Sequence, residues 1–410
     1  MTTSNGDYQE LVVQAIDGLQ EELVETSLDI HAHPELNYEE HHAAMLLADS
    51  LESHGFQVER GVGGVETAFR GTILGGKADG PTVALLAEYD ALPDIGHGCG
   101  HNLIAISNLG AGLGVRAAME SLGGRLVVLG TPAEEGGGGK IRMLDAGVFD
   151  DVDVALSSHP ASNLTAIPTE IPMGESWSLA MVGYRYAFHG KAAHAAAVPY
   201  EGINALNAVI HLFTGIDALR QHLKPDVRIH GVITDGGKAA NVVPDFAAAN
   251  FMLRSKDVEY LNEVVEKVSQ VADGAARMTG ASLEILPAHP MYENVRPSEA
   301  LARSIKANAL RVGMKLNEPV AGGGSGASTD FGNVSQVVPS FALRFAVSET
   351  PVPGHSLAMT EAAKTDLAQA SAIATAKALA LTACDLLSDP SLLAEARKEF
   401  RARADAPARL

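Results

Sequence analysis

The chain has 410 residues, of which 46% are hydrophobic and 20% charged, so it is long enough to form two globular domains. Acidic residues outnumber basic ones by 50 to 30, and the formal net charge of −20 argues against a surface that binds nucleic acid. The sequence contains no predicted membrane span or signal peptide, and its two cysteines lie far apart. We therefore expect a cytoplasmic protein that binds no membrane and has no disulfide framework.

The first part of the chain alternates helical and strand patterns. Residues 8–30 and 40–54 have helical spacing, whereas Thr82–Ala87, Leu126–Gly130 and Val152–Ser157 are typical of short, buried strands. Such alternation predicts an α/β fold with a mainly parallel sheet and helices on both faces. In sheets of this kind, ligands bind beyond the carboxyl ends of the strands.

The pattern changes after residue 175. A strand–helix–strand–strand–helix order predicts a small α+β domain over residues 176–290, inserted into a first domain formed by residues 1–175 and 291–410. The inserted elements are expected at Leu179–His189, Gly202–Arg220, Arg228–Thr234, Ala247–Arg254 and Val258–Met278. The first domain then continues with a helix at Ser298–Gly313, a Gly-rich loop at Gly322–Ser328, a helix at Thr360–Leu387 and a peripheral charged tail, Ser388–Leu410.

Residue types that bind metal ions follow the first predicted strand. Cys99 and His101 flank Gly100 in a Gly-rich loop, which allows both side chains to turn toward one ion. The surrounding segment, residues 88–102, is rich in such groups and contains Glu88, Asp90, Asp94, His97, Cys99 and His101. This composition predicts a metal site at the end of a buried strand.

Further candidate ligands follow the other two strands. Glu134 and Glu135 are adjacent carboxylates, of which one can bind an ion while its neighbour acts as a general base toward water. His159 follows the third strand, and His355 would complete the set from the far end of the chain. The alternatives are a surface acid pair for the two glutamates and ordinary turn or loop positions for the two histidines.

Five candidate ligands are too many for one tetrahedral zinc ion and suit two ions that share a bridge. A thiolate combined with imidazoles and carboxylates favours Zn²⁺, with Mn²⁺ or Co²⁺ as alternatives. We therefore expect two divalent metal ions and a hydrolytic centre. The predicted ligands are Cys99, His101, Glu135, His159 and His355.

These motifs together resemble the M20 metallopeptidase family, and in particular its amidohydrolase branch, subfamily D, which includes aminoacylase-like, p-aminobenzoyl-glutamate hydrolase and dipeptidase-like enzymes. The resemblance is carried by Glu88–Pro93, Gly98–Asn102, Glu134-Glu135, His159 and Gly354-His355. It implies that Glu134 is the general base and that Asp90 orients a ligand. It also implies a ferredoxin-like lid domain that forms a homodimer. Glu88 occupies a position that is His in other branches and is not counted as a ligand.

The resemblance extends to the inserted domain and to the Gly-rich loop. It implies that His194 stabilises the oxyanion, commonly across the dimer, and that Asn241 and Arg254 contact a substrate carboxylate. The loop Gly322–Asn333 would line the substrate pocket, with Gly326 and Ser328 as contacts. A polar loop position for His194 and a surface ion pair for Arg254 remain alternatives.

The expected reaction is hydrolysis of the amide bond of an N-acyl or N-aroyl amino acid, or of a small dipeptide, that carries a free carboxylate. One rival is an amidase in which Cys99 is the nucleophile and His101 the base, although i, i+2 neighbours rarely reach that geometry. A second rival is a non-catalytic binding protein that contains metal. The segment His31–Glu35 is a further His-rich stretch, which we attribute to packing rather than to the metal site.

Overall fold

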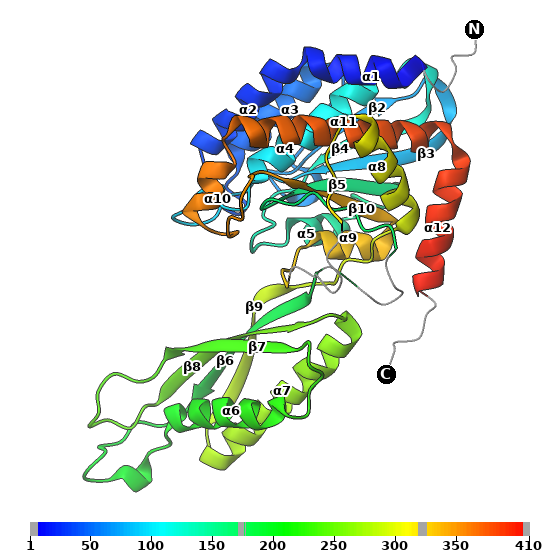
Figure 1. The fold of residues 1–410 in the computed structure, drawn as a ribbon. Helices are drawn as coiled ribbons and strands as arrows, with labels where there is room; N and C mark the ends of the chain where they lie inside the picture. Colours follow the sequence, from blue (N-terminus) through cyan, green and yellow to red (C-terminus); the bar gives the residue numbers. More distant parts are fainter. Residues whose placement is uncertain (1–6, 171–175, 177, 319–325, 405–410) are drawn as a thin grey trace. The chain divides into compact units, whose positions relative to one another are not determined.

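The computed structural model describes residues 7–170, 176, 178–318 and 326–404, which form two compact units (Figure 1). Unit 1 consists of Met1–Glu175, Arg296–Gly323 and Asn333–Leu410, and unit 2 of Ser176–Val295 and Gly324–Gly332. The segment 324–332 thus belongs to unit 2, whereas the sequence placed it in the first domain. The reason is local pairing, because the backbone N–H of Leu179 donates to the carbonyl of Ala327 at 2.8 Å.

Unit 1 is built on a six-stranded sheet. The strand order is β1-β2-β4-β3-β5-β10, in which β4, β3, β5 and β10 run parallel and β1 and β2 add antiparallel pairings at one edge. The bounds are β1 (Gln57–Arg60), β2 (Phe69–Leu74), β3 (Lys77–Ala87), β4 (Gly123–Gly130), β5 (Val154–Ala161) and β10 (Ser340–Ala346). The predicted mainly parallel sheet is confirmed. The sequence missed β1, β2 and β10, which are short and carry few of the continuous apolar runs typical of buried parallel strands.

The helices α4 (His101–Arg116) and α11 (Asp366–Ser388) pack side by side over one face of this sheet, and the short helices α5 (Gly139–Asp145) and α9 (Phe331–Val337) lie on the opposite side (Figure 1). Of the described helices, only α11 is long and apolar enough to cross a membrane, but most of it is buried against α4 and α8. We therefore interpret α11 as a core helix. The other helices are α1 (Asp7–Gly18), α2 (Gln20–Ala32), α3 (His41–Ser53), α8 (Glu299–Arg311), α10 (Leu357–Ala362) and α12 (Pro390–Ala404), with 3₁₀ turns at Val62–Gly64 and Met119–Ser121.

Two predictions for the ends of the chain need correction. Residues 8–30 form two helices rather than one, because the chain breaks at Leu19, directly after Gly18. The charged tail is not merely peripheral, since it forms α12. In that helix Glu399 accepts hydrogen bonds from the Ser298 hydroxyl at 2.8 Å and from the Ala300 backbone N–H at 3.0 Å, and thereby caps α8.

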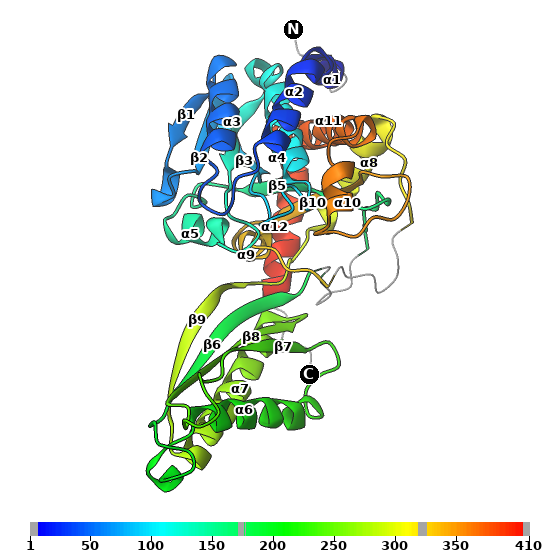
Figure 2. The same cartoon turned by 90° about the vertical axis from the view of Figure 1, so that its left-hand side faces the viewer.

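Unit 2 is a four-stranded antiparallel sheet with order β7-β8-β6-β9, covered on one face by α6 and α7 (Figure 2). Its elements are β6 (Ala180–His189), a 3₁₀ turn (Pro199–Glu201), α6 (Ala205–Arg220), β7 (Arg228–Asp235), β8 (Phe246–Ser255), α7 (Val258–Thr279) and β9 (Ser282–Tyr292). This order is that of a ferredoxin-like domain, as predicted. The sequence missed β9, because Pro287 and Pro290 interrupt its pattern.

Candidate metal centre

The loops that follow β3, β4 and β5 share one edge of the unit 1 sheet. Strand β3 lies between β4 and β5, and Ala87 at its end is in register with Gly130 at the end of β4. Because parallel strands present their carboxyl ends at the same edge, the three sets of predicted side chains lie close together there.

Asp90 links the first two of these loops. Its Oδ1 lies 3.0 Å from Nδ1 of His101, and its Oδ2 accepts a 2.8 Å hydrogen bond from the backbone N–H of Glu135. Burial by itself would raise the pKa of Asp90, but the facing imidazole outweighs it and keeps that pKa low; in return Asp90 raises the pKa of His101 well above its usual value. Asp90 therefore fixes the imidazole so that Nε2 faces the other candidate ligands.

Two ligand atoms in this region fit a bound cation. His101 Nε2 and Glu135 Oε1 are 3.7 Å apart, and both are buried without a hydrogen-bond partner in the part of the chain that the structure describes. Buried polar atoms are normally satisfied, so each such atom requires an explanation. A divalent ion bound by both atoms would satisfy them, and these residue types are suitable ligands for it.

Cys99 and His159 lie on the same side of this site. Cys99 Sγ is 3.5 Å from His159 Nε2, while His159 Nδ1 donates to the carbonyl of Pro160 at 2.7 Å and leaves Nε2 as a free ligand atom. Burial lowers the pKa of His159 to about 4, so the imidazole is in the neutral form that binds metal. Burial, followed by the charge of Glu135, raises the pKa of the Cys99 thiol to about 12 in the absence of an ion.

Gly100 permits this approach of the two loops. Its φ of +74° is left-handed, and a Cβ at this position would lie 2.9 Å from Cγ of Pro160. Only glycine fits both conditions without strain, and it therefore sets the turn that presents Cys99 and His101 on either side.

His355 joins the site from the segment before α10. Its backbone N–H donates to the carbonyl of Gly98 at 2.9 Å, its φ is +54°, and its Nε2 lies 3.5 Å from Glu135 Oε2. The five predicted ligands thus form two groups that share Cys99. Within each group the ligand atoms lie within 4.8 Å of one another, and the groups are Cys99, His101, His159 and Cys99, Glu135, His355.

Glu134 and Glu88 form a further group with His101, again within 4.8 Å. Glu134 Oε2 and Glu88 Oε2 lie 3.8 and 3.7 Å from His101 Nε2. Glu88 is paired with Lys140 at 2.8 Å, and the side chain of Lys140 is fully buried. The sequence did not single out Lys140, although a lysine just after an acidic strand end is a detectable signal of charge compensation.

The connection between α2 and α3 supports both acidic loops. The carbonyl of Glu35 accepts from the Ala91 N–H at 2.8 Å, the Glu40 carboxylate accepts from the Ala133 N–H at 2.8 Å, and the Tyr38 hydroxyl donates to the carbonyl of Gly137 at 2.5 Å. We call the segment Glu35–Glu40 the bracket. Sequence reasoning missed this role, because nothing in the pattern shows that a loop near the amino terminus reaches two strand ends.

The buried Glu40 carboxylate has a second partner, the hydroxyl of Thr67, at 2.9 Å. Burial, followed by the charge of Asp90, raises the pKa of Glu40 to about 7. Ala133, which it holds, has a φ of +60°, an unusual conformation for a residue with a side chain. Glu40 therefore stabilises the strained turn that directly precedes Glu134 and Glu135.

The neighbouring His-rich stretch lies outside these groups. His31 Nε2 contacts the carbonyl of Thr360 at 2.8 Å, and the Glu35 carboxylate caps α3 through the N–H groups of His42 and Ala43. A separate group that could hold an ion is formed by Asp29, His33 and His42, but ordinary ion pairs of 2.7 and 3.3 Å to Asp29 account for it.

The remaining predicted site residues belong to unit 2. Nδ1 of the exposed His194 accepts from the N–H groups of Ala196 and Ala197 at 3.3 and 3.2 Å, so Nε2 carries the proton and is a hydrogen-bond donor. His194 forms an isolated bridge with Val242, next to the exposed Asn241.

Arg254 on β8 donates from Nη1 to the Ser328 hydroxyl at 3.1 Å, and nearby Gly326 has a φ of +65°. The structure therefore brings Arg254 and the described end of the Gly-rich loop together. Residues 322–325 of that loop lie outside the described residues.

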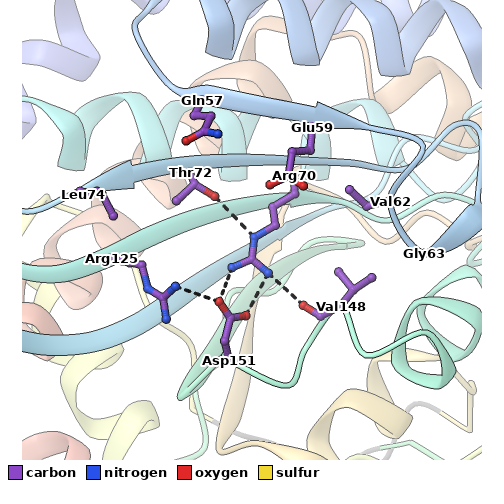
Figure 3. Close-up of a pocket in the computed structure, with 10 residues that line it drawn as sticks. All are labelled: Gln57, Glu59, Val62, Gly63, Arg70, Thr72, Leu74, Arg125, Val148 and Asp151. Atoms are coloured by element: carbon purple, nitrogen blue, oxygen red, sulfur yellow. Dashed lines mark hydrogen bonds and ion pairs between the residues drawn. The ribbon is translucent and has the colours of Figure 1, made fainter.

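A surface cavity of about 490 Å³ in unit 1 contains none of the predicted site residues (Figure 3). It is lined mainly by residues of β1, β2 and β4, and Arg70 crosses it to form a double ion pair with Asp151 at 2.7 and 3.0 Å. Arg125 contacts the same carboxylate at 3.1 Å. Because Asp151 neutralises both cations, we do not connect this cavity with the metal centre.

A thiol, imidazoles and carboxylates with unsatisfied ligand atoms, at the carboxyl edge of a mainly parallel sheet, define a metal-dependent hydrolase. The profile of the peptidase dimerisation domain matches residues 180–278. The chain is 39% identical over 402 residues to the Xaa-Arg dipeptidase of Mus musculus, covering 95% of this chain and 91% of that protein. It is 32% identical over 462 residues to a p-aminobenzoyl-glutamate hydrolase of Escherichia coli K12, covering 94% and 93%.

The fold agrees with these relatives. A crystal structure of a dinuclear metal-binding peptidase of the M20 family from Bacillus subtilis superimposes with a TM-score of 0.69 at 20% identity, covering 90% of this chain and 99% of that one. The chain belongs to the M20 metallopeptidase family, as its motifs predicted, and is a metal-dependent hydrolase.

Proposed function

We propose that this chain hydrolyses the amide bond of an N-acyl or N-aroyl amino acid, or of a small dipeptide, next to a free carboxylate. The relatives named as an Xaa-Arg dipeptidase and a p-aminobenzoyl-glutamate hydrolase support this substrate class. The observation that carries the proposal is the pair of unsatisfied ligand atoms, His101 Nε2 and Glu135 Oε1, beside a second carboxylate, Glu134.

Two divalent ions, with Zn²⁺ favoured by the thiol, would be held by the five predicted ligands, Cys99, His101, Glu135, His159 and His355. When bound, such ions lower the pKa of water and polarise the amide carbonyl. Asp90 holds His101 and the Glu135 backbone in place for this purpose.

Glu134 is the proposed general base, because its carboxylate lies in the ligand cluster but is not needed to complete either group around Cys99. It takes the proton of the attacking water and returns it to the leaving amine. From the family resemblance, we assign His194 to stabilising the oxyanion, with its Nε2–H as donor, and Asn241, Arg254, Gly326 and Ser328 to binding the substrate. We further propose that unit 2 forms a homodimer, which the match to a dimerisation domain supports.

The rival hypothesis, a Cys99 nucleophile, is less well supported. Burial raises the pKa of the thiol, and a protonated thiol is a poor nucleophile. Among the described residues, Cys99 lies 3.5 Å from an imidazole that burial keeps neutral, but the same contact is expected of two ligands of one ion.

Replacement of Glu134 tests the proposal. Glu134→Gln keeps the shape and removes the base, so we expect kcat to fall at least about a hundredfold while the metal content is unchanged. Hydrolysis would be followed by release of the free amine from N-acetyl amino acids, hippurate, p-aminobenzoyl-glutamate and dipeptides. Full activity of Glu134→Gln with metal bound would refute the assignment.

A further inference from the structure

Strand β10 places a cation beside the metal centre. Arg344 is in register with His159 in the parallel pairing of β10 and β5. Register partners on adjacent strands project to the same face of a sheet, so the Arg344 side chain lies next to the imidazole that we assign to metal binding. No signal in the sequence points to this arginine, because β10 itself was not predicted.

Arg344 is unusual among the arginines of unit 1. Arg70, Arg303 and Arg397 each form an ion pair with a carboxylate, whereas Arg344 has no ion pair or hydrogen bond within residues 7–170, 176, 178–318 and 326–404. It is nevertheless largely buried, and burial lowers its pKa. The one charge that acts in the opposite direction is that of Cys99.

A buried cation without an anionic partner is costly, and such groups cluster at binding sites, where the ligand supplies the missing charge. A guanidinium is suited to this task because its fork of N–H donors matches a carboxylate. The neighbouring metal centre would hold the scissile amide, so an anion at Arg344 would belong to the same substrate.

We propose that Arg344 binds a carboxylate of the substrate and that the chain therefore prefers acidic over neutral or basic amide substrates. This inference rests on the proposed function. Arg254 in unit 2 also lacks a carboxylate partner among the described residues and contacts only the Ser328 hydroxyl. With one such guanidinium in each unit, the chain suits a substrate that carries two carboxylates, such as an N-acyl or N-aroyl derivative of glutamate or aspartate.

A different role for Arg344 would be to hold the Cys99 thiolate and so to strengthen metal binding. That role would affect every substrate equally and would change the metal content. Substrate binding by Arg344 affects only substrates with the second carboxylate. The two roles are therefore separable by measurement.

The experiment compares the metal-loaded wild type with Arg344→Met, Arg344→Lys and a control, Arg311→Met, which alters an exposed arginine that donates to Asn308. Substrates are matched pairs that differ only in charge, N-acetyl-glutamate with N-acetyl-glutamine and p-aminobenzoyl-glutamate with p-aminobenzoyl-glutamine, together with N-acetyl-arginine. Metal content is measured for every variant.

We expect the wild type to prefer the glutamate member of each pair. Arg344→Met should lower kcat/KM for that member about 10- to 100-fold, the range of a charged hydrogen bond, and change the glutamine member less than about threefold. Arg344→Lys should restore part of the difference, and the control should have no effect. Equal losses on both members, loss of metal, or a wild-type preference for N-acetyl-arginine would overturn the proposal.

Binding of glutarate, measured by calorimetry on the same proteins, separates this proposal from the proposed function. If the wild type hydrolyses none of the amides but binds glutarate, and Arg344→Met does not, the hydrolase assignment fails and the carboxylate site stands. If glutarate binds wild type and Arg344→Met equally, or binds neither, Arg344 is not a carboxylate site.

Discussion

Glu40 provides a demanding test of how the bracket supports the metal centre. Its buried carboxylate holds the Ala133 N–H at 2.8 Å and accepts from the Thr67 hydroxyl at 2.9 Å. Glu40→Gln keeps an oxygen for Ala133, and its amide N–H₂ can donate to a reoriented Thr67 hydroxyl. Glu40→Leu removes both hydrogen bonds and leaves the N–H before Glu134 without its partner. We therefore expect activity in the glutamine variant and its loss in the leucine variant.

The size of the effect on stability follows from the pKa of Glu40, which is raised from 4.5 to about 7. A carboxyl whose pKa is higher in the folded state binds its proton more tightly there, so it favours folding at low pH and opposes it once ionised. This contribution is lost as the pH rises from the unfolded pKa near 4.5 through the folded pKa near 7. At 1.36 kcal/mol per pKa unit, the total is about 3 kcal/mol, of which about 2 kcal/mol falls between pH 5 and pH 8.

Urea unfolding of the metal-free protein at pH 5 and pH 8 measures this quantity, with far-ultraviolet circular dichroism as the probe. Relative to wild type, Glu40→Gln should gain about 2 kcal/mol at pH 8 compared with pH 5, because its amide does not ionise. Thr67→Val, which removes one of the two donors, serves as the control that keeps the titrating group. An identical pH dependence in wild type and Glu40→Gln would refute the reasoning.

Two further substitutions test single contacts of the centre. Gly100→Ala places a Cβ 2.9 Å from Pro160 Cγ in a residue with a φ of +74°, so it should destabilise unit 1 by about 1–3 kcal/mol, measured by thermal unfolding. Gly313, also at positive φ but with open space around it, is the control, and an equal loss at both positions would mean that the close approach is unimportant. Lys140→Met leaves Glu88 as an uncompensated buried charge, with an expected cost of about 3–5 kcal/mol. The double variant with Glu88→Gln should recover much of that stability, and no recovery would contradict the pairing.

The sequence predicts most of the fold, because the apolar runs of β3, β4 and β5 and the helical periods of α6 and α7 are strong local signals. It places the candidate ligands well for the same reason, since each of those before residue 160 follows a recognisable strand. Its errors concern segments that depend on tertiary contacts. The exposed strand β9 contains two prolines, and β1 has only four residues.

The supporting residues were hidden from the sequence for a related physical reason. Glu40 and Tyr38 act through hydrogen bonds to backbone atoms about one hundred positions away, and those atoms carry no sequence signal. Arg344 is noticeable only by its lack of a carboxylate partner in the described structure and by its register with His159. Both properties exist only after folding.

The most direct test of the metal centre is the metal content of the purified protein, measured together with amide hydrolysis before and after chelation. Two divalent ions per chain, lost with activity on chelation and restored together on adding Zn²⁺, Mn²⁺ or Co²⁺, are the predicted result. A protein that hydrolyses its substrate equally well with and without metal would contradict the assignment of Cys99, His101, Glu135, His159 and His355 as ligands.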